Sequence, residues 1–279
     1  MKYVFWGTPQ FAAIVLRRLG DCGLIPSVLV ANPDRPVGRK KIITPPPTKQ
    51  LVTAQGWDTE ILQSERASEL VDRMQILKPD LYVIAAYAHI IPHALIAIPR
   101  LGVVGVHPSL LPLHRGPTPI QSALLHGDHE TGTSLFLIDE QVDHGPVLAA
   151  RRMPIEENAT YETLLASLAE IGGELLCNTL PKFVAGHITS TPQDDARATF
   201  TKKFSSEDGF VLWENLREAK RTGRGAEELL RKIRALNPEP GIYTRESSGK
   251  RLKLLRAHMA DGKLALTLTQ REGETPKSS

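Results

Sequence analysis

Two loops rich in glycine and proline hold the residues of this chain that are best suited to acid–base chemistry. The first reads GVHPSLLPLHRGPTPIQ over residues 105–121 and carries His107 near its start. The second reads IDEQVDHGP over residues 138–146 and carries Asp143. Each follows an apolar run, and packing alone does not require prolines, glycines and polar side chains to gather in this way. We therefore expect the two loops to bring His107 and Asp143 together.

A histidine paired with a carboxylate is suited to moving protons. The imidazole gains and loses a proton near neutrality, and the carboxylate fixes the tautomer of the ring. Such a pair suits the attack of an amine on a carbonyl carbon, because one proton leaves the amine, another reaches the leaving group, and an oxyanion develops. Taken on its residue type alone, His107 is more often explained as a hydrogen-bonded histidine at a strand end.

Strand-like runs alternate with helical patterns through the first part of the chain, which predicts a parallel sheet. The apolar runs cover residues 2–6, 27–30, 81–86 and 103–106, and helical patterns cover residues 10–19 and 67–77. Ligands of open α/β sheets bind at the carboxyl ends of the strands. By this rule the binding side of the sheet holds Gly7, Asn32, Tyr87 and His107.

The rest of the chain predicts a second, smaller domain behind a linker. Residues 189–203 are mostly polar without a clear period, which suits a linker between a catalytic domain over residues 1–188 and a C-terminal domain over residues 204–279. In the C-terminal domain, residues 226–235 have a helical pattern. The Asp261-Gly262 pair lies between two apolar runs and predicts a β-hairpin.

The composition is that of a globular chain and excludes several classes. Of 279 residues, 41% are hydrophobic and 23% are charged, which argues against a disordered or fibrous chain. No apolar run approaches the ~20 residues of a membrane helix, so we expect a cytoplasmic protein with no membrane association. Cys22 and Cys177 are too few and too separated for a zinc site, and we expect two thiols without chemistry. The net charge of +3 is concentrated in residues 204–279, a weak sign of an anionic partner.

The two loops resemble the signature of the folate-dependent formyltransferases, in which a histidine precedes Ser-Leu-Leu-Pro and a later aspartate precedes a glycine. Further segments are similar to the members of this family that act on methionyl initiator tRNA: FWGTPQFA at residues 5–12, PDRPVGR at 33–39 with PPPTK at 45–49, AAYAHIIP at 85–92 and ALNPEP at 235–240. The resemblance therefore covers nearly the whole chain.

The resemblance implies an α/β fold class, with a Rossmann-like, mostly parallel sheet in the formyltransferase domain and a small, β-rich, OB-like C-terminal domain. Residues 204–279 are shorter than the C-terminal domain of the family, so we expect a reduced barrel or an open sheet there. The implied reaction transfers the formyl group of the co-substrate 10-formyltetrahydrofolate to the amino group of methionyl initiator tRNA, for translation initiation. The implied protein is a monomer without metal, with initiator tRNA and reduced folate as its partners.

The resemblance also assigns roles to residues. His107 would be the acid/base and oxyanion partner, and Asp143 would orient it. The reduced folate would contact the first loop at Ser109, Leu110, Leu111 and Pro112, and a second loop at Tyr87, His89 and Ile90. A basic insertion would bind tRNA phosphates through Arg39, Lys40 and Lys41, of which Arg39 is the main contact.

Position 105 departs from the pattern of the family. The residue two before the histidine is normally an asparagine whose amide would hold the formyl oxygen, and here it is Gly105. Loss of one oxyanion donor lowers a rate by about 100- to 1,000-fold unless another group replaces it. Because His107 and Asp143 are retained, we expect a water, a backbone N–H or another side chain to compensate.

Other functions remain open on the sequence. A nucleotide-binding dehydrogenase is disfavoured because GTPQFA at residues 7–12 lacks the repeated glycines that approach a pyrophosphate. A formyltransferase for an amino-sugar nucleotide, glycinamide ribonucleotide or another small amine would share the folate loop and the catalytic pair, but the basic C-terminal domain and the Arg39 insertion favour tRNA. Gly105 also permits a catalytically impaired tRNA-binding homologue, and a folate-binding sensor is a further alternative.

Overall fold

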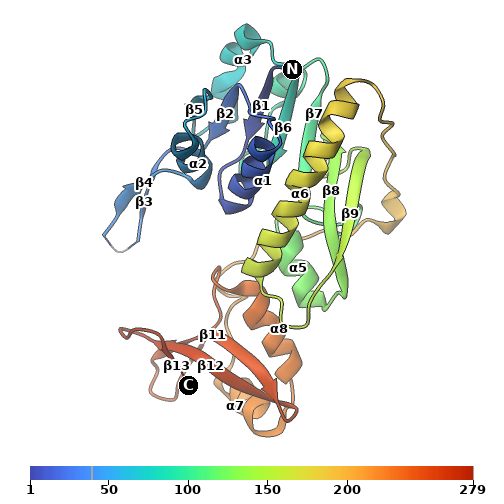
Figure 1. Cartoon of the computed structure of the whole chain (residues 1–279). Coiled ribbons are helices and arrows are strands. Elements are labelled where there is room, and N and C mark those ends of the chain that lie inside the picture. Colours follow the sequence, from blue (N-terminus) through green and yellow to red (C-terminus); the bar gives the residue numbers. More distant parts are fainter. Residues whose placement is uncertain (39, 279) are drawn as a thin grey trace. The chain divides into compact units, whose positions relative to one another are not determined.

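The computed structural model describes residues 1–38 and 40–278, and the chain in it divides into two compact units (Figure 1). The first unit comprises Met1–Arg115, Thr131–Met153 and Leu165–Phe200. The second unit comprises Gly116–Glu130, Pro154–Leu164 and Thr201–Ser279.

A seven-stranded sheet of order β5-β2-β1-β6-β7-β8-β9 forms the centre of the first unit. The strands from β5 to β7 are parallel to their neighbours, and β8 is antiparallel to β7. The strands are β1 (Tyr3–Trp6), β2 (Val28–Ala31), β5 (Glu60–Gln63), β6 (Leu81–Ala85), β7 (Val103–His107), β8 (Glu130–Leu137) and β9 (Val147–Pro154). The predicted Rossmann-like, mostly parallel sheet is thereby confirmed.

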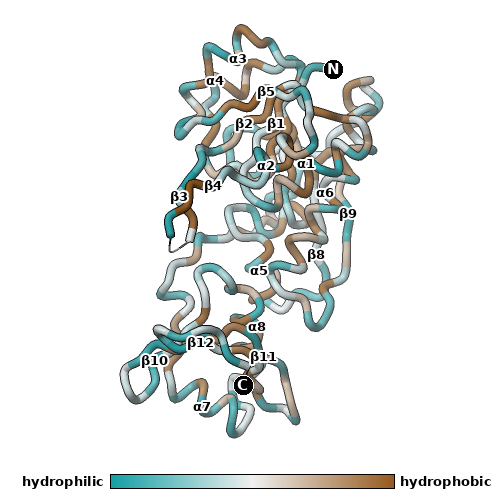
Figure 2. The backbone as a smooth tube through the Cα atoms, turned by 60° about the vertical axis from the view of Figure 1, so that its left-hand side comes forward, coloured by the Kyte–Doolittle hydropathy of each residue, from teal (hydrophilic) through white to brown (hydrophobic). Residues whose placement is uncertain are grey.

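The sequences of the central strands are almost entirely apolar. All residues of β1, β2 and β7 are buried, as both faces of a parallel sheet in an α/β protein require. Figure 2 shows this as hydrophobic colour along β1 and β2. The accompanying helices are α1 (Gln10–Asp21), α2 (Pro47–Gln55), η1 (Ala67–Leu70), α3 (Val71–Leu77), α4 (His93–Ile96), α6 (Tyr161–Val184) and η2 (Asp195–Arg197).

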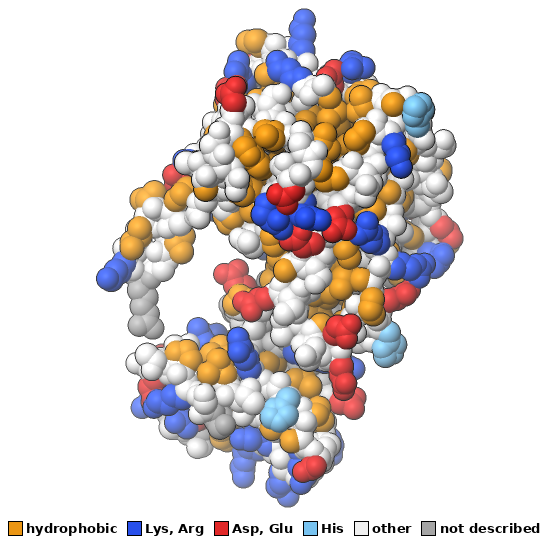
Figure 3. Space-filling view, in the orientation of Figure 1, with side chains coloured by type: hydrophobic (Ala, Val, Ile, Leu, Met, Phe, Trp, Pro, Cys, Tyr) orange, Lys and Arg blue, Asp and Glu red, His pale blue; other side chains and the backbone are white. Residues whose placement is uncertain are grey.

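Helix α6 packs closely against β7 and α1 because it carries two adjacent glycines. A Cβ atom on Gly172 would lie 2.8 Å from Val106 Cγ1, and one on Gly173 would lie 2.4 Å from Arg18 Cβ. Charged side chains gather over α1 and α6 (Figure 3), where Arg18 Nη2 lies 2.8 Å from Glu174 Oε1. The two helices are therefore joined by both tight packing and ion pairs.

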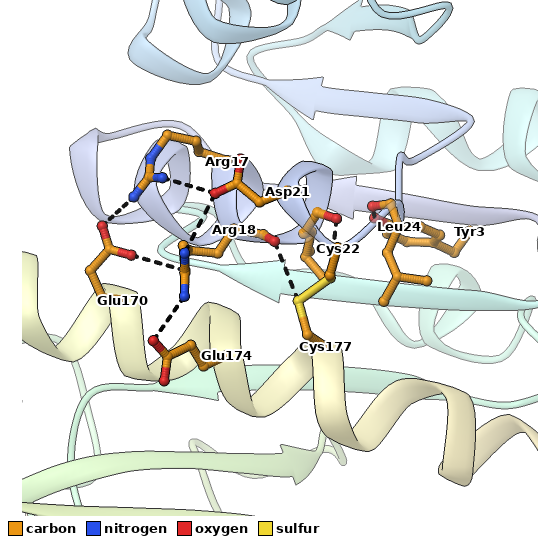
Figure 4. The surroundings of a disulfide bond; sticks show 10 residues. Tyr3, Arg17, Arg18, Asp21, Cys22, Leu24, Glu170, Glu174 and Cys177 are labelled. Carbon is orange, nitrogen blue, oxygen red and sulfur yellow. Dashed lines mark hydrogen bonds and ion pairs between the residues drawn. A yellow bond between two sulfur atoms is a disulfide. The ribbon is translucent and has the colours of Figure 1, made fainter.

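A disulfide joins the same two helices, and the expectation of two independent thiols is wrong. Cys22, which follows α1, is bonded to Cys177 in α6, with their Cα atoms 6.2 Å apart (Figure 4). The pairing depends on how α1 and α6 pack, because 155 residues separate the two cysteines in the chain. Cys22 is exposed, so a reductant in solution can reach the bond.

Reduction of this disulfide is expected to lower the free energy of unfolding of the first unit. A cross-link that closes a long loop restricts the unfolded chain, and native disulfides contribute about 2–4 kcal/mol. Thermal unfolding with and without dithiothreitol measures the difference, and the Cys22→Ser/Cys177→Ser variant, which cannot respond to the reductant, is the control. Equal midpoints for the oxidised and reduced wild-type chain would contradict the expectation.

The second unit contains a four-stranded antiparallel sheet of order β10-β11-β12-β13. Its elements are α5 (Pro119–His126), α7 (Trp213–Thr222), α8 (Ala226–Leu236), β10 (Tyr243–Arg245), β11 (Arg251–Ala260), β12 (Lys263–Arg271) and β13 (Lys277–Ser278). The predicted helix and the predicted hairpin are both present. Asp261 and Gly262 have φ angles of 48° and 72°, which a two-residue hairpin turn with two left-handed positions requires.

Among the described residues, none of the helices has both the length and the apolarity needed to cross a membrane.

Candidate active site

His107 is the last residue of β7 and is buried, with 6% of its surface exposed. Its ring Nε2 lies 2.9 Å from the backbone oxygen of His114, and its Nδ1 lies 3.5 Å from Asp143 Oδ2. The structure therefore brings together the two residues that the sequence paired. Both belong to the first unit.

The contacts of the His107 ring assign the roles of its two nitrogens. A backbone carbonyl only accepts hydrogen bonds, so Nε2 carries the hydrogen that points to His114 O. In the neutral ring Nδ1 then holds the free lone pair, on the side of Asp143. When Nδ1 takes a proton, the ring becomes a cation that faces a carboxylate, and the attraction between the opposite charges stabilises it. The geometry thus suits a base that accepts a proton at Nδ1.

Asp143 lies in the loop between β8 and β9, in an unusual backbone conformation. Its φ angle is +50°, in the left-handed region that few non-glycine residues occupy. Two residues later, a Cβ on Gly145 would lie 1.8 Å from Leu137 O, so only glycine fits there. The backbone conformation of this loop therefore depends on the left-handed Asp143 and on Gly145. The Asp143 side chain is 22% exposed, whereas that of His107 is 7% exposed.

The loop after His107 is stabilised by its own hydrogen bonds. The buried Ser109 hydroxyl donates to Leu113 O at 2.6 Å. Ser134 of β8 donates through its hydroxyl to Ser109 O at 2.8 Å and accepts from Leu111 N at 3.1 Å. Half-buried side chains in this loop belong to Leu110, Leu111 and Pro112. The residues predicted to contact the folate thus lie in a hydrogen-bonded loop next to His107.

The second predicted folate loop follows β6. The Tyr87 ring packs edge-on against Trp6 and His89, with both centroid separations at 5.3 Å, and His89 Nε2 lies 3.0 Å from Asn32 Oδ1. Burial raises the pKa of Tyr87 to about 12, and its hydroxyl has no hydrogen-bond partner in the described part of the chain. Ile90 is 94% exposed.

A cavity of about 400 Å³ adjoins this loop, and the residues that line it are Glu65, Arg66, Ala67, Ser68, Ala88, His89, Ile90 and Pro92. It combines an apolar wall with charged and polar side chains, as small-molecule sites do.

The basic insertion forms a hairpin of β3 (Arg35–Val37) and β4 (Ile42–Thr44), which stands out from the rest of the first unit in Figure 1. Lys40 and Lys41 are exposed in its turn. Arg39 lies outside the described residues. Exposed apolar side chains on the two strands belong to Val37, Ile42 and Ile43.

Gly105 is covered by a residue that the sequence reasoning missed. Phe136 of β8 is the cross-strand partner of Gly105, and a Cβ on Gly105 would lie 2.4 Å from Phe136 Cε1 and 2.7 Å from Cζ. The Phe136 ring is 3% exposed and packs edge-on to His107, with the centroids 6.4 Å apart. An aromatic ring therefore fills the space into which an asparagine at position 105 would begin to extend. The contact between Phe136 and Gly105 follows from the register between β7 and β8, which the sequence alone does not reveal.

Comparisons with known proteins identify the family of the chain. Residues 1–180 match the family model described as formyl transferase, and residues 205–274 match the model described as formyl transferase, C-terminal domain. The chain belongs to the formyl transferase family. It is 39% identical over 260 residues to the methionyl-tRNA formyltransferase of Roseiflexus castenholzii, covering 93% of this chain and 80% of that relative.

Two solved structures share the fold. Methionyl-tRNA formyltransferase from Clostridium thermocellum matches over 100% of both chains, with a TM-score of 0.62 and 16% identity. HypX from Aquifex aeolicus in complex with tetrahydrofolic acid matches with a TM-score of 0.68 and 20% identity. The match covers 96% of this chain, which spans less than half of HypX, at 44%.

Proposed function

We propose that the chain transfers the formyl group of 10-formyltetrahydrofolate to the amino group of methionyl initiator tRNA. The observation that carries the proposal is the His107–Asp143 pair at the carboxyl end of β7, with Nδ1 3.5 Å from the carboxylate. The likeness in sequence to methionyl-tRNA formyltransferases over 93% of the chain supports this acceptor.

The chemistry follows from the two nitrogens of the ring. The amine lone pair forms a bond to the formyl carbon, and the carbonyl electrons move to the oxygen. His107 Nδ1 takes the proton that leaves the amine, while Asp143 stabilises the ring cation. The bond from the formyl carbon to the folate nitrogen then breaks as the oxyanion collapses, and the ring returns a proton to that nitrogen. The products are tetrahydrofolate and the N-formyl amine, and the His107 ring is neutral again.

We place the reduced folate between the loop of Ser109, Leu110, Leu111 and Pro112 and the loop of Tyr87, His89 and Ile90. The residues fit such a ligand, because the buried Tyr87 hydroxyl has no hydrogen-bond partner in the described part of the chain. The pterin ring carries several hydrogen-bond donors and acceptors that could supply one. The neighbouring cavity beside His89 supplies apolar wall area for a flat ring.

We place the tRNA on the β3–β4 hairpin, through Lys40 and Lys41 together with Arg39. Lys and Arg at an exposed turn attract phosphates in a salt-dependent way. The second unit, taken by itself, carries further basic side chains, and Figure 3 shows several of them. We expect a cytoplasmic monomer that uses no metal. A reducing cytoplasm keeps most cysteines as thiols, so both redox forms of the Cys22–Cys177 pair are relevant.

The test is formylation of methionyl initiator tRNA by the purified chain with 10-formyltetrahydrofolate, run on oxidised and reduced protein. We expect turnover on the charged initiator tRNA and none on an amino-sugar nucleotide or glycinamide ribonucleotide at the same concentration. Turnover only on a small amine would assign a different acceptor. Binding of tRNA without turnover would make the chain an impaired homologue, and binding of folate alone would make it a sensor.

A further inference from the structure

Residues 191–199, which lie in the stretch expected to be a linker, connect the two loops of the candidate site. At one end Thr191 and Val147 exchange both backbone hydrogen bonds at 2.8 Å. At the other end Arg115 N donates to Thr199 O at 2.9 Å, and His114 N donates to the Thr199 hydroxyl at 2.8 Å. We call residues 191–199 the strap. It belongs to the first unit, like both loops.

The middle of the strap presents one side chain to the Asp143 loop. The Gln193 amide nitrogen donates to Asp143 O at 2.9 Å and to Gly145 O at 2.7 Å. The Gln193 amide oxygen accepts from Arg115 Nε at 3.1 Å and from Arg115 Nη2 at 2.8 Å. Both hydrogens and both lone pairs of the amide are therefore used. A side chain with every bond satisfied has one orientation.

The Arg115 side chain holds the Gln193 amide in that orientation. It is 3% exposed, and a buried guanidinium is stable only when its donors are paired. Arg115 Nη2 also donates to Asp195 Oδ1 at 2.7 Å, and this hydrogen bond holds the pKa of Asp195 below its usual value. Asp195 is also in the strap, so Arg115 is bound by two strap residues at once.

The Asp143 loop needs hydrogen bonds of this kind to keep its backbone conformation. Asp143 has a φ angle of +50°, which a chain adopts only when its surroundings hold it there. The two carbonyls that Gln193 binds are those of Asp143 itself and of Gly145, on either side of His144. Without these donors the loop can relax, and the carboxylate would move away from His107 Nδ1.

We propose that Gln193, held by the buried Arg115, is a positioning residue that keeps the Asp143 carboxylate beside His107. The inference rests on the proposed function, in which Asp143 stabilises the protonated ring. It assigns a catalytic consequence to a residue that touches neither substrate nor the reacting atoms.

The test is Gln193→Glu, which keeps the size of the side chain and the bond to Arg115 but replaces both N–H donors by an anion that faces two carbonyl oxygens. A misplaced catalytic group lowers a rate by up to about 100-fold, and we expect kcat for formyl transfer to fall about 10- to 100-fold. The KM for the folate should change less than twofold, because the folate loops keep their own hydrogen bonds. Gln75→Glu, the same change at an exposed position of α3, is the matched control and should leave kcat unchanged.

The same substitution is then made in the Asp143→Ala background under single-turnover conditions. If Gln193 acts through Asp143, Gln193→Glu has no further effect there. An equal fall in both backgrounds, or a raised KM with unchanged kcat, would overturn the proposal. A thermal midpoint within a few degrees of wild type excludes a general loss of structure.

A second readout separates this proposal from the proposed function. The imidazole NMR signals of His107 at fixed pH report the nearby carboxylate without any acceptor. We expect Gln193→Glu to shift them in the same direction as Asp143→Asn. If the wild-type chain formylates nothing but these shifts agree, the proposed function fails and the positioning role stands. Unchanged His107 signals in Gln193→Glu would overturn the positioning role even in an active enzyme.

Discussion

Replacement of His107 by alanine or asparagine is expected to abolish most of the formyl transfer while leaving folate binding intact. Removal of a general acid–base group lowers a rate by about 100- to 10,000-fold. The ring lies at the end of β7, and the loop that we assign to the folate keeps the hydrogen bonds of Ser109 and Ser134 when it loses the one from the His107 ring to His114 O. Single-turnover formylation measures the rate, and quenching of protein fluorescence by tetrahydrofolate measures the binding.

His93→Ala is the control for this prediction, because the His93 side chain is 73% exposed on α4. It should retain the wild-type rate. If His107→Asn keeps more than a tenth of the wild-type rate, the His107–Asp143 pair is not the proton-transfer site, and the mechanism proposed above is wrong.

Gly105→Asn is expected to lower both stability and activity, although it introduces the residue that the family resemblance leads us to expect at this position. The new Cβ would meet Phe136 Cε1 at 2.4 Å, and forcing extra atoms into a packed interior destabilises a protein by about 1–3 kcal/mol. Because the Phe136 ring also packs against His107, its displacement disturbs the proposed base. Urea unfolding and the formylation rate measure the two effects.

The same substitution is expected to behave differently in the Phe136→Ala background. Removal of the ring leaves a cavity that an asparagine side chain can occupy, so Gly105→Asn should be neutral or stabilising there and should raise the rate. A matched control is Phe11→Ala, which removes a buried ring from α1. If Gly105→Asn is equally harmful in the Phe136→Ala background, the two positions are independent.

The sequence predicts those parts of the structure whose signal is local. The central strands are apolar throughout, and His107 is followed by a proline that ends β7, so the sheet and the position of the histidine can both be anticipated. The Asp261-Gly262 hairpin is equally local, because its two left-handed positions call for these residue types.

What the sequence does not predict depends on packing between distant segments. Cys22 meets Cys177 only because α1 packs on α6, and Phe136 meets Gly105 only through the register of two antiparallel strands. Gln193 lies in a stretch without hydrophobic period, so its contacts with Asp143 and Arg115 leave no trace in the pattern. The residues that support the candidate site are therefore harder to find than the residues within it.

The interleaving of the two units along the chain limits how this protein can exchange parts with its relatives. The second unit combines residues 205–274, which match the C-terminal family model, with the earlier segment Gly116–Glu130. Helix α5 from that segment packs on α8, where Gly127 lies against Arg231. A recombination event that replaced only the C-terminal stretch would leave α5 facing a foreign helix. A single crossover between Glu130 and Thr201 would therefore separate α5 from α8, whereas a crossover before Gly116 would carry all segments of the second unit together.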